Sequence, residues 1–362
     1  MINLNPEKLA RTIRTLRIFV DKSLGLEDKN VQVNGFSLNP VLLEAAAFNT
    51  YVETVSDKAD RLYDRVKESN AEMMVWSYLD ALKAITGRFE FSQKSVMLAF
   101  DYTDEDFFGD VQGFSIHGVK KEGAVTGAFR FLTCSVVSDD IPQKIPLLSI
   151  PIYMGHSMSK EISYCLTLLR KIIGPITLIL FDRGFYSKEL MHTLTTAGYP
   201  YLIFIPKNEQ VKKELDMMIK NEQKTIIYEF EFADGNTTTK GQTYQTFLKQ
   251  IFCKKLEKNL DWAFASNIED LQLDGIIRTY KKRWRIETGF RIQDEATIRC
   301  KSKEMKIRFF LFLYEQLLQT LWICFFKEEV NFKGFIIEMS KTCNKLYEKE
   351  NKNTPVSSKA IR

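Results

Sequence analysis

Two unusually apolar runs in the sequence each end in an aspartate. Residues 95–101 read SVMLAFD and residues 176–182 read ITLILFD. The second run is apolar enough to be buried on both faces, as strands in the centre of a parallel or mixed sheet are. Strand-like runs alternate with helical patterns from residue 95 onward, which is typical of a sheet covered by helices. The sequence therefore predicts an α/β fold.

The two strand-end aspartates, Asp101 and Asp182, are the first candidate site residues. Ligand sites of α/β sheets gather at the carboxyl ends of strands, so both side chains point to the same kind of location. The alternative is that each aspartate only caps the turn that follows. Very apolar strands offer nothing that compensates an unpaired carboxylate, which favours the functional interpretation.

A third acid, Glu287, lies in a long helical pattern predicted from residue 274 to about residue 300. Polar side chains recur there every three or four residues and would share one helix face: Tyr280, Arg283, Glu287, Arg291 and Asp294. An ordinary salt-bridged stripe would have the same spacing, and each of its ion pairs would be worth only a few tenths of a kcal/mol.

The charge of this region is more informative than its spacing. Between residues 275 and 308 the chain has eleven Lys and Arg against four Asp and Glu, a net charge of +7, whereas the whole chain has +5. The rest of the chain therefore sums to −2. Such a concentration of positive charge is typical of a site for a polyanion.

Several classes of protein are excluded by the residue counts. The six cysteines are scattered without a C-x-x-C pair, and there are three histidines, so a disulfide framework or a zinc site is not expected. The most apolar segment, residues 307–326, contains Arg308 and Glu315, so it is predicted to be a buried helix rather than a membrane span. We expect a cytoplasmic protein with no membrane contact.

The pattern along the chain predicts three parts. Residues 1–92 read as helices, with Asn5-Pro6 and Asn39-Pro40 as helix starts. Residues 93–330 form the α/β domain, interrupted at about 211–260 by a β-rich insertion with a turn at Asp234-Gly235-Asn236. Residues 331–362 are a C-terminal helix and tail.

The acids and their context resemble the DDE transposases of prokaryotic insertion sequences. The resemblance depends on Asp101 in AFDYTDEDFFG, Asp182 in LILFDRGFYS, and Tyr280-x2-Arg283-x3-Glu287 in that order. It covers about residues 95–322 and is most similar to the group with a Tyr-Arg-Glu-Lys signature. The lysine of that signature is Asp294 here. Nearby bases that could replace it are Arg291, Lys301 and Lys303. Asp294 itself is expected to be a helix-surface acid paired with a base such as Arg291 or Arg285, and not a further metal ligand.

The resemblance implies an RNase H-like mixed sheet flanked by helices, with Asp101, Asp182 and Glu287 as the catalytic metal ligands. Two Mg²⁺ ions, for which Mn²⁺ can substitute, would be held by these three carboxylates, because Mg²⁺ prefers hard oxygen ligands. Such a pair of ions supports in-line displacement at phosphorus. The metal charge would also keep three crowded carboxylates ionised.

Other residues are expected to contact DNA. Tyr280 and Arg283 would bind phosphates near the cleaved end, and Arg291 is included with them. Trp262 would stack on an unpaired base, as an aromatic residue of this region does in some relatives, although a core tryptophan is the alternative. Arg11, Arg14 and Arg17 recur every three residues and form either a phosphate-binding face or a solvated one.

The predicted function is a DNA transposase that cuts at the terminal inverted repeats of its element and transfers the 3′ ends to target DNA. Its partner would be double-stranded DNA, bound by a homodimer associated with the nucleoid, and residues 1–92 would help to recognise the ends. Two alternatives stay open: a structure-specific nuclease on the same fold, and a DNA-binding protein without activity.

Overall fold

The computed structural model describes residues 4–26, 34–111, 113–119, 123–221, 225–234, 244–257, 260–269 and 275–353. The strands are β1 (Val96–Phe107), β2 (Gly127–Val136), β3 (Pro146–Ile152), β4 (Ile176–Phe181), β5 (Tyr201–Phe204), β6 (Thr225–Asp234), β7 (Tyr244–Glu257) and β8 (Leu260–Ser266). The α-helices are α1 (Pro6–Ser23), α2 (Gly35–Phe48), α3 (Val52–Val55), α4 (Ala59–Glu68), α5 (Ala71–Thr86), α6 (Met158–Leu169), α7 (Lys188–Thr196), α8 (Glu209–Lys220), α9 (Ile276–Lys281), α10 (Trp284–Gln293), α11 (Met305–Phe325) and α12 (Phe332–Asn353). Short 3₁₀ turns are η1 (Gly87–Phe89), η2 (Phe91–Gln93), η3 (Arg183–Phe185) and η4 (Asp294–Ala296).

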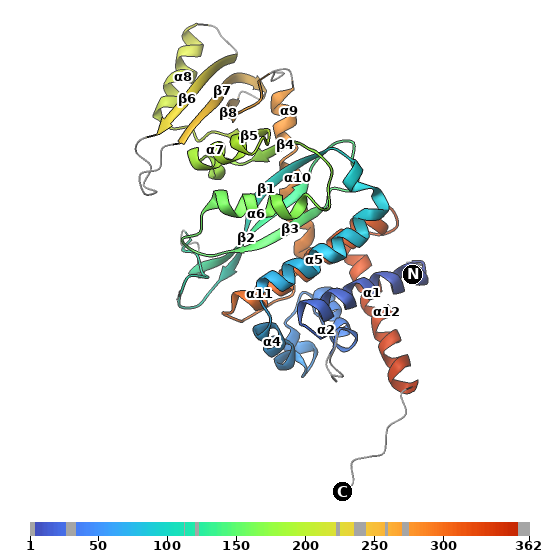
Figure 1. The fold of residues 1–362 in the computed structure, drawn as a ribbon. Coiled ribbons are helices and arrows are strands. Elements are labelled where there is room, and N and C mark those ends of the chain that lie inside the picture. The colour runs from blue at the N-terminus through green and yellow to red at the C-terminus, as the bar shows by residue number, and fades with distance from the viewer. Residues whose placement is uncertain are drawn as a thin grey trace.

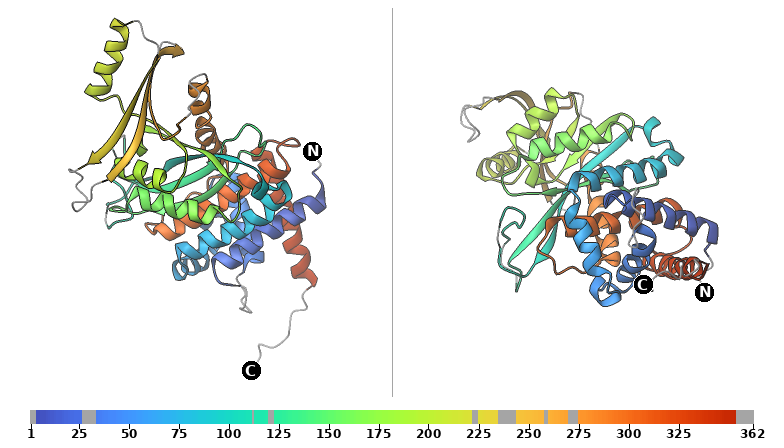
Figure 2. Two further views of the ribbon diagram at one scale, coloured as in Figure 1. Left: turned by 45° about the horizontal axis from the view of Figure 1, so that its top comes forward. Right: turned by 60° about the horizontal axis from the view of Figure 1, so that its bottom comes forward.

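All the strands belong to one mixed sheet with the order β3-β2-β1-β4-β5-β8-β7-β6. The pairs β1–β4 and β4–β5 are parallel, while β2 is antiparallel to both of its neighbours. Helices cover both sides of the sheet, and α8 lies with β6 and β7 at the end of the molecule opposite α12 (Figures 1 and 2). The α/β prediction is therefore confirmed as a mixed sheet with helices.

The two apolar strands are buried on both faces, as their sequences predicted. Leu98 and Phe100 of β1 belong to the larger hydrophobic cluster, which includes α6 and α7, whereas Ala99 between them belongs to a smaller cluster with α9 and α10. In β4, Ile179 belongs to the larger cluster and Leu180 to the smaller one. Successive side chains of a strand point to opposite faces, so both faces need apolar residues here.

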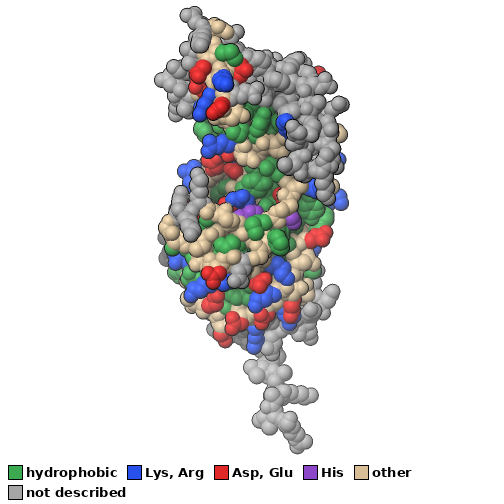
Figure 3. Space-filling view, turned by 90° about the vertical axis from the view of Figure 1, so that its left-hand side faces the viewer, with side chains coloured by type: hydrophobic (Ala, Val, Ile, Leu, Met, Phe, Trp, Pro, Cys, Tyr) green, Lys and Arg blue, Asp and Glu red, His purple; other side chains and the backbone are tan. Residues whose placement is uncertain are grey.

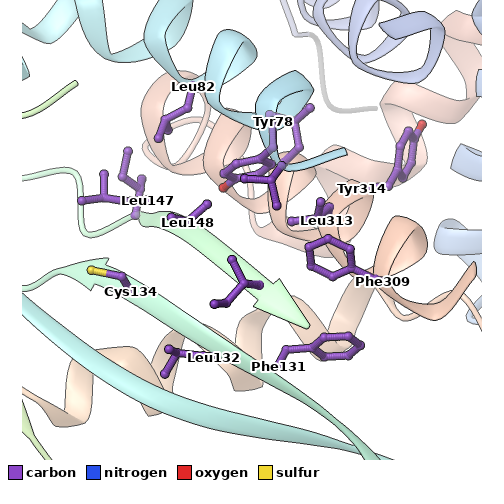
Figure 4. Packing of buried hydrophobic residues seen from close by; sticks show 14 of the residues in the cluster. Tyr78, Leu82, Phe131, Leu132, Cys134, Leu147, Leu148, Phe309, Leu313 and Tyr314 are labelled. Carbon is purple, nitrogen blue, oxygen red and sulfur yellow. The ribbon is translucent and has the colours of Figure 1, made fainter. Parts of the chain in front are cut away.

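The N-terminal helices share the larger cluster with the sheet and with α11. Figure 4 shows Tyr78 and Leu82 of α5 and Phe309 of α11 packed over β2 and β3, and the rings of Phe131 and Phe309 lie 5.8 Å apart. In the described part of the chain, no helix is long and apolar enough to cross a membrane. The apolar segment of residues 307–326 forms most of α11, and its Gln316 bonds the Ser149 hydroxyl in the core.

The helix-start predictions had mixed outcomes. Asn5 caps α1 by accepting from the backbone N–H groups of Glu7 and Lys8, as expected. Asn39-Pro40 does not start a helix, because Asn34 and Ser37 form a capping box five residues earlier and Pro40 lies inside α2. The predicted turn at Asp234-Gly235-Asn236 extends outside the described residues, as does the end of the predicted C-terminal tail.

The long helix predicted for residues 274–300 is interrupted. The chain forms α9, turns at Lys282 and Arg283, continues as α10, and tightens into η4. At the turn the N–H of Arg283 donates to the carbonyl of Tyr280, three residues back, instead of four. This corner between α9 and α10 sets the direction of the Arg283 side chain.

Candidate active site

Asp101 and Asp182 lie side by side because their strands are parallel neighbours. Phe100 of β1 is opposite Phe181 of β4, and each aspartate follows its phenylalanine. Asp101 continues β1, whereas Asp182 leaves β4 and starts the 3₁₀ turn η3. Parallel strands bring equivalent positions to the same edge, so the structure places the two predicted acids together.

Arg283 brings the third acid to this pair. Its Nη1 donates to Oδ2 of Asp101 at 2.8 Å, and its Nη2 donates to Oε1 of Glu287 at 2.5 Å. The same Nη2 lies 3.9 Å from Oδ1 of Asp182. The three carboxylates, called here the acid cluster (Asp101, Asp182 and Glu287), therefore surround one guanidinium group.

The shared nitrogen limits the size of the cluster. Because the 3.9 Å and 2.5 Å separations meet at Nη2, Oδ1 of Asp182 and Oε1 of Glu287 lie no more than 6.4 Å apart. Arg283 stands between them, and in the described residues no group of three or more His, Cys, Asp or Glu side chains is close enough to hold a metal ion as it stands. The three carboxylates therefore face one position, which the guanidinium of Arg283 occupies in this structure.

The electrostatics of Asp101 reflect this crowding. The pKa of Asp101 is raised from 3.8 to about 6, mainly by burial; Arg283 opposes this rise, whereas the charges of Asp182 and Glu287 add to it. The backbone N–H of Tyr102 donates to the other carboxylate oxygen of Asp101 at 2.9 Å. The arginine therefore offsets only part of the cost of placing this carboxylate among others.

The acid cluster has the donor chemistry of a magnesium site. Its ligands are hard carboxylate oxygens, and the cluster has three carboxylates against a single guanidinium. A divalent cation would offset the cost of burying these charged carboxylates and would reduce their mutual repulsion. These are the two effects that raise the pKa of Asp101. The residues present therefore fit Mg²⁺ or Mn²⁺.

Tyr280 and Trp262 are buried beside the cluster. Tyr280 is 2% exposed and Trp262 is 5% exposed, and their rings lie 6.0 Å apart in an aromatic group that includes Phe204 and Phe264. The Tyr280 hydroxyl and the Arg283 Nε are buried without a hydrogen-bond partner. Stacking of a base on Trp262 or a phosphate bond to Tyr280 would require these groups to become accessible, and both roles stay predictions.

Among the described residues, no hydrogen bond or ion pair joins the other expected DNA contacts to the acid cluster. Arg291 is exposed on α10, where its Nη2 lies 3.4 Å from the Thr288 hydroxyl. Arg11, Arg14 and Arg17 are exposed on α1, which packs against α2, α5, α11 and α12 (Figure 1). Arg17 lies 3.6 Å from Asp21 and over the ring of Phe36. Their DNA-binding roles also stay predictions.

The positive excess of residues 275–308 is partly used inside the protein. Among the described residues, four of its basic side chains form ion pairs with acids elsewhere or within the segment: Lys282, Arg283, Arg285 and Arg308. Figure 3 shows one face of the molecule, on which acidic and basic side chains are interspersed over the lower, helical half. The sequence count therefore overstates the charge that is free for a polyanion.

Two of those pairs fix the corner at Arg283, and sequence reasoning missed their partner. Lys282 Nζ and Arg285 Nη2 bind the two carboxylate oxygens of Asp139 at 2.5 and 2.6 Å. Arg285 also donates to the carbonyl of Val137. Hydrogen bonds from Lys282 and Arg285 lower the pKa of Asp139 to about 2. No local signal marks Asp139, because it follows β2 and is far from α10 in the sequence.

Asp294 was expected to pair with Arg291 or Arg285, and this is wrong. Arg285 binds Asp139, and Asp294 forms no ion pair in the described part of the chain. Instead it lines a cavity of about 120 Å³ together with Glu105, Glu315 and Arg308, and Arg308 pairs with Glu105. Burial raises the pKa of Asp294. The reason lies in the packing: Arg285 is bound by Asp139, and Asp294, at the end of α10, faces the cavity.

Comparisons with known proteins found similarity to transposases in sequence and in fold. A family model described as a transposase DDE domain matches residues 158–315, which include Asp182 and Glu287 but not Asp101. The fold is similar to that of a piggyBac transposase, solved by cryo-EM as a synaptic complex with hairpin DNA. The TM-score is 0.58 at 12% identity, covering 99% of this chain and 84% of that chain. No curated protein matches the sequence.

Proposed function

We propose that this chain is a DDE transposase that cuts DNA at the terminal inverted repeats of an insertion sequence and transfers the 3′ ends to target DNA. The observation that carries the proposal is the convergence of Asp101, Asp182 and Glu287 on one guanidinium. These acids come from two strands and a helix far apart in the sequence, in the order of the resemblance. The match to the transposase DDE model and the transposase-like fold support the same function.

The proposed fold is RNase H-like. It is supported by strands in the order β3-β2-β1-β4-β5, with β4 and β5 parallel to β1 and β2 antiparallel. The hairpin β6–β7 and strand β8 extend this sheet, and we assign them to the insertion between the second and third acids. We also propose that residues 1–92 form a DNA-end-binding domain, that residues 93–330 hold catalysis, and that residues 331–362 end the chain as a helix and tail.

Asp101, Asp182 and Glu287 would hold two Mg²⁺ or Mn²⁺ ions. When bound, the metal supplies Lewis-acid stabilisation of the attacking and leaving oxygens at phosphorus. The protein contributes orientation: β1 and β4 fix two carboxylates at one edge of the sheet, and α10 presents the third. Arg283, with its planar fork of donors, is suited to bind a phosphate of the DNA end.

The test is a strand-transfer assay with purified protein, a linear DNA bounded by the inverted repeats that flank the gene, a target plasmid and Mg²⁺. The proposal expects cleavage at the repeat ends and covalent joining of the 3′ ends to the plasmid. Asp182→Asn should abolish both products, whereas Arg170→Gln should retain them, because Arg170 is an exposed base after α6 that bonds the Tyr199 hydroxyl and contributes nothing to the acid cluster or to the corner at Arg283.

Two other outcomes would point to the alternatives. Cleavage without joining, at branched or flapped DNA rather than at the repeats, would indicate the structure-specific nuclease. Specific binding of the repeats with no cleavage in either metal would indicate an inactive DNA-binding protein. Sizing of the complex with two end duplexes would test the proposed homodimer.

A further inference from the structure

We propose that Arg283 is an exchangeable counter-cation of the acid cluster. In the metal-free protein its guanidinium holds the three carboxylates together, and divalent cations that bind these carboxylates displace it and make it available to a DNA phosphate. The inference rests on the proposed function and adds a link between metal loading and binding of the DNA end. Arg283 is thus a positioning residue that binds the carboxylates in the metal-free protein and a DNA phosphate in the metal-bound protein.

Arg283 and a divalent cation would compete for the same carboxylates of the acid cluster. Arg283 uses Oδ2 of Asp101 and Oε1 of Glu287 in charge-assisted hydrogen bonds of 2.8 and 2.5 Å. Each carboxylate has a second oxygen, but a divalent cation bound at the cluster would stand beside the guanidinium, and the two positive charges would repel each other. Metal binding therefore disfavours the present position of Arg283.

The cluster is accessible although the arginine is not. The side chains of Glu287 and Asp182 are 47% and 36% exposed, whereas that of Arg283 is 6% exposed. A hydrated ion can reach the two outer carboxylates first. Arg283 has no direct route to a phosphate while these acids cover it.

The backbone at Arg283 is fixed on both sides. Lys282 and Arg285 both bind the carboxylate of Asp139, and Arg285 also holds the carbonyl of Val137. The corner between α9 and α10 is therefore tied to the segment after β2 independently of the acid cluster. Loss of the Arg283 ion pairs would then move a side chain, and the corner would keep its place.

The arginine is also incompletely bonded where it lies. Its Nε is buried without an acceptor, and the neighbouring Tyr280 hydroxyl is buried without a partner. Buried polar groups are normally satisfied, so these two reduce the net stability of the metal-free arrangement. A permanent structural ion pair would be expected to satisfy them.

The test measures metal binding, which does not depend on activity. Mn²⁺ is titrated by isothermal calorimetry into the wild type, Arg283→Gln, Arg283→Lys, the control Arg170→Gln, and Asp182→Asn, and the midpoint of thermal unfolding is measured with and without Mn²⁺. Arg283→Gln should bind Mn²⁺ about tenfold more tightly than the wild type, because a like charge and two charge-assisted bonds no longer oppose the metal.

The metal-free unfolding midpoint of Arg283→Gln should fall, and saturating Mn²⁺ should restore it. Arg283→Lys, which keeps the charge but not the fork, should show an intermediate affinity, and Arg170→Gln should match the wild type. Unchanged or weaker Mn²⁺ binding in Arg283→Gln would overturn the proposal. If that variant does not fold, wild-type affinity in Arg283→Lys would overturn it.

A second measurement uses the wild type alone. Phenylglyoxal labels accessible arginines, and peptide mapping by mass spectrometry reports each site. Arg283 should be protected without metal and become labelled with saturating Mn²⁺, while Arg285 should be labelled equally in both conditions. Labelling of Arg283 that does not change with Mn²⁺ would overturn the exchange.

The outcomes separate this inference from the proposed function. If Mn²⁺ does not bind the wild type, or binds Asp182→Asn equally well, the metal site itself is wrong and the proposed function fails with it. If Mn²⁺ binds the wild type through Asp182 but Arg283→Gln gains no affinity, only the exchange fails.

Discussion

Arg283 and Asp101 are 182 residues apart in the sequence, and Nη1 of the arginine donates to Oδ2 of the aspartate at 2.8 Å. This bond joins the corner between α9 and α10 to the middle of the sheet. Glu287 lies one turn after Arg283 on α10 and receives the other arm of the same guanidinium at 2.5 Å. Arg283 thus links Glu287 of α10 to Asp101 of β1 and to Asp182 at the end of β4.

The first prediction separates catalysis from DNA binding. Asp182→Ala should abolish cleavage but leave binding to the end duplex intact or slightly tighter, because it removes a metal ligand and a negative charge near phosphate. Arg283→Ala should weaken end binding and reduce the slope of log K against log salt by about one. Gel shifts across a salt series would measure both, with Arg170→Ala as the control for loss of an arginine away from the acid cluster. Equal losses of binding in the Asp182 and Arg283 variants would contradict these roles.

The second prediction concerns pH and the stability of the metal-free protein. The folded-state pKa of Asp101 is about 6, above its ordinary value of 3.8. The native state therefore binds more protons than the unfolded state between these values, so the contribution of Asp101 to stability is full below about pH 4 and is lost as pH rises through about 6. Asp101→Asn, which imitates the protonated acid, should gain in unfolding midpoint relative to the wild type over this interval.

Asp139 is the control for this prediction, because its pKa is shifted in the opposite direction. The pKa of Asp139 is lowered to about 2, so its contribution is present above its ordinary value of 3.8 and is lost as pH falls toward 2. Asp139→Asn should therefore be less stable than the wild type near neutral pH, and the difference should shrink in acid. Parallel pH curves for Asp101→Asn and the wild type would show that Asp101 is not the perturbed group.

The third prediction tests Tyr280. Its hydroxyl is buried without a partner, so Tyr280→Phe should leave the unfolding midpoint nearly unchanged or slightly higher, because no hydrogen bond is lost. If the hydroxyl binds a phosphate after rearrangement at the DNA end, the same variant should weaken end binding in the presence of metal. A stable Tyr280→Phe protein with wild-type end binding would assign Tyr280 to the aromatic core alone.

The fourth prediction concerns Asp294, which stands where the resemblance has lysine. It lines a cavity with Glu105 and Glu315, and burial raises the pKa of Asp294 and raises that of Glu315 well above its ordinary value. Asp294→Lys should raise the unfolding midpoint by about a few degrees, since a base would replace one of several neighbouring acids. Its Mn²⁺ affinity should equal that of the wild type, because Asp294 is not one of the proposed ligands.

A DNA readout completes the test of Asp294. Binding to cleaved ends should strengthen by about 1 kcal/mol if the lysine reaches a phosphate, and should stay unchanged if it binds Glu105 or Glu315. Asp294→Asn is the control for loss of charge without a new base. A large loss of Mn²⁺ binding in Asp294→Lys would show that the metal site had been assigned to the wrong acids.

The sequence by itself determined the local features of this protein. Residues 178–181 are apolar at every position and are buried in the structure, and the sequence also showed that Asp182 follows this strand. The cap at Asn5 is equally local, because its bonds reach only two and three residues along the chain. The order of the three acids was also available from the sequence.

The tertiary structure alone decided which charges meet. The sequence spacing put Arg283 and Glu287 on one helix face, and they do pair, but the contact of Arg283 with Asp101 depends on the turn before α10 and on the tie of Lys282 and Arg285 to Asp139. The packing also decided that Asp294 lines a cavity and, in the part of the chain that the structure describes, forms no ion pair. Helical periodicity describes the neighbours within one helix, whereas long-range ion pairs depend on how separate elements pack, and no spacing along the chain encodes that.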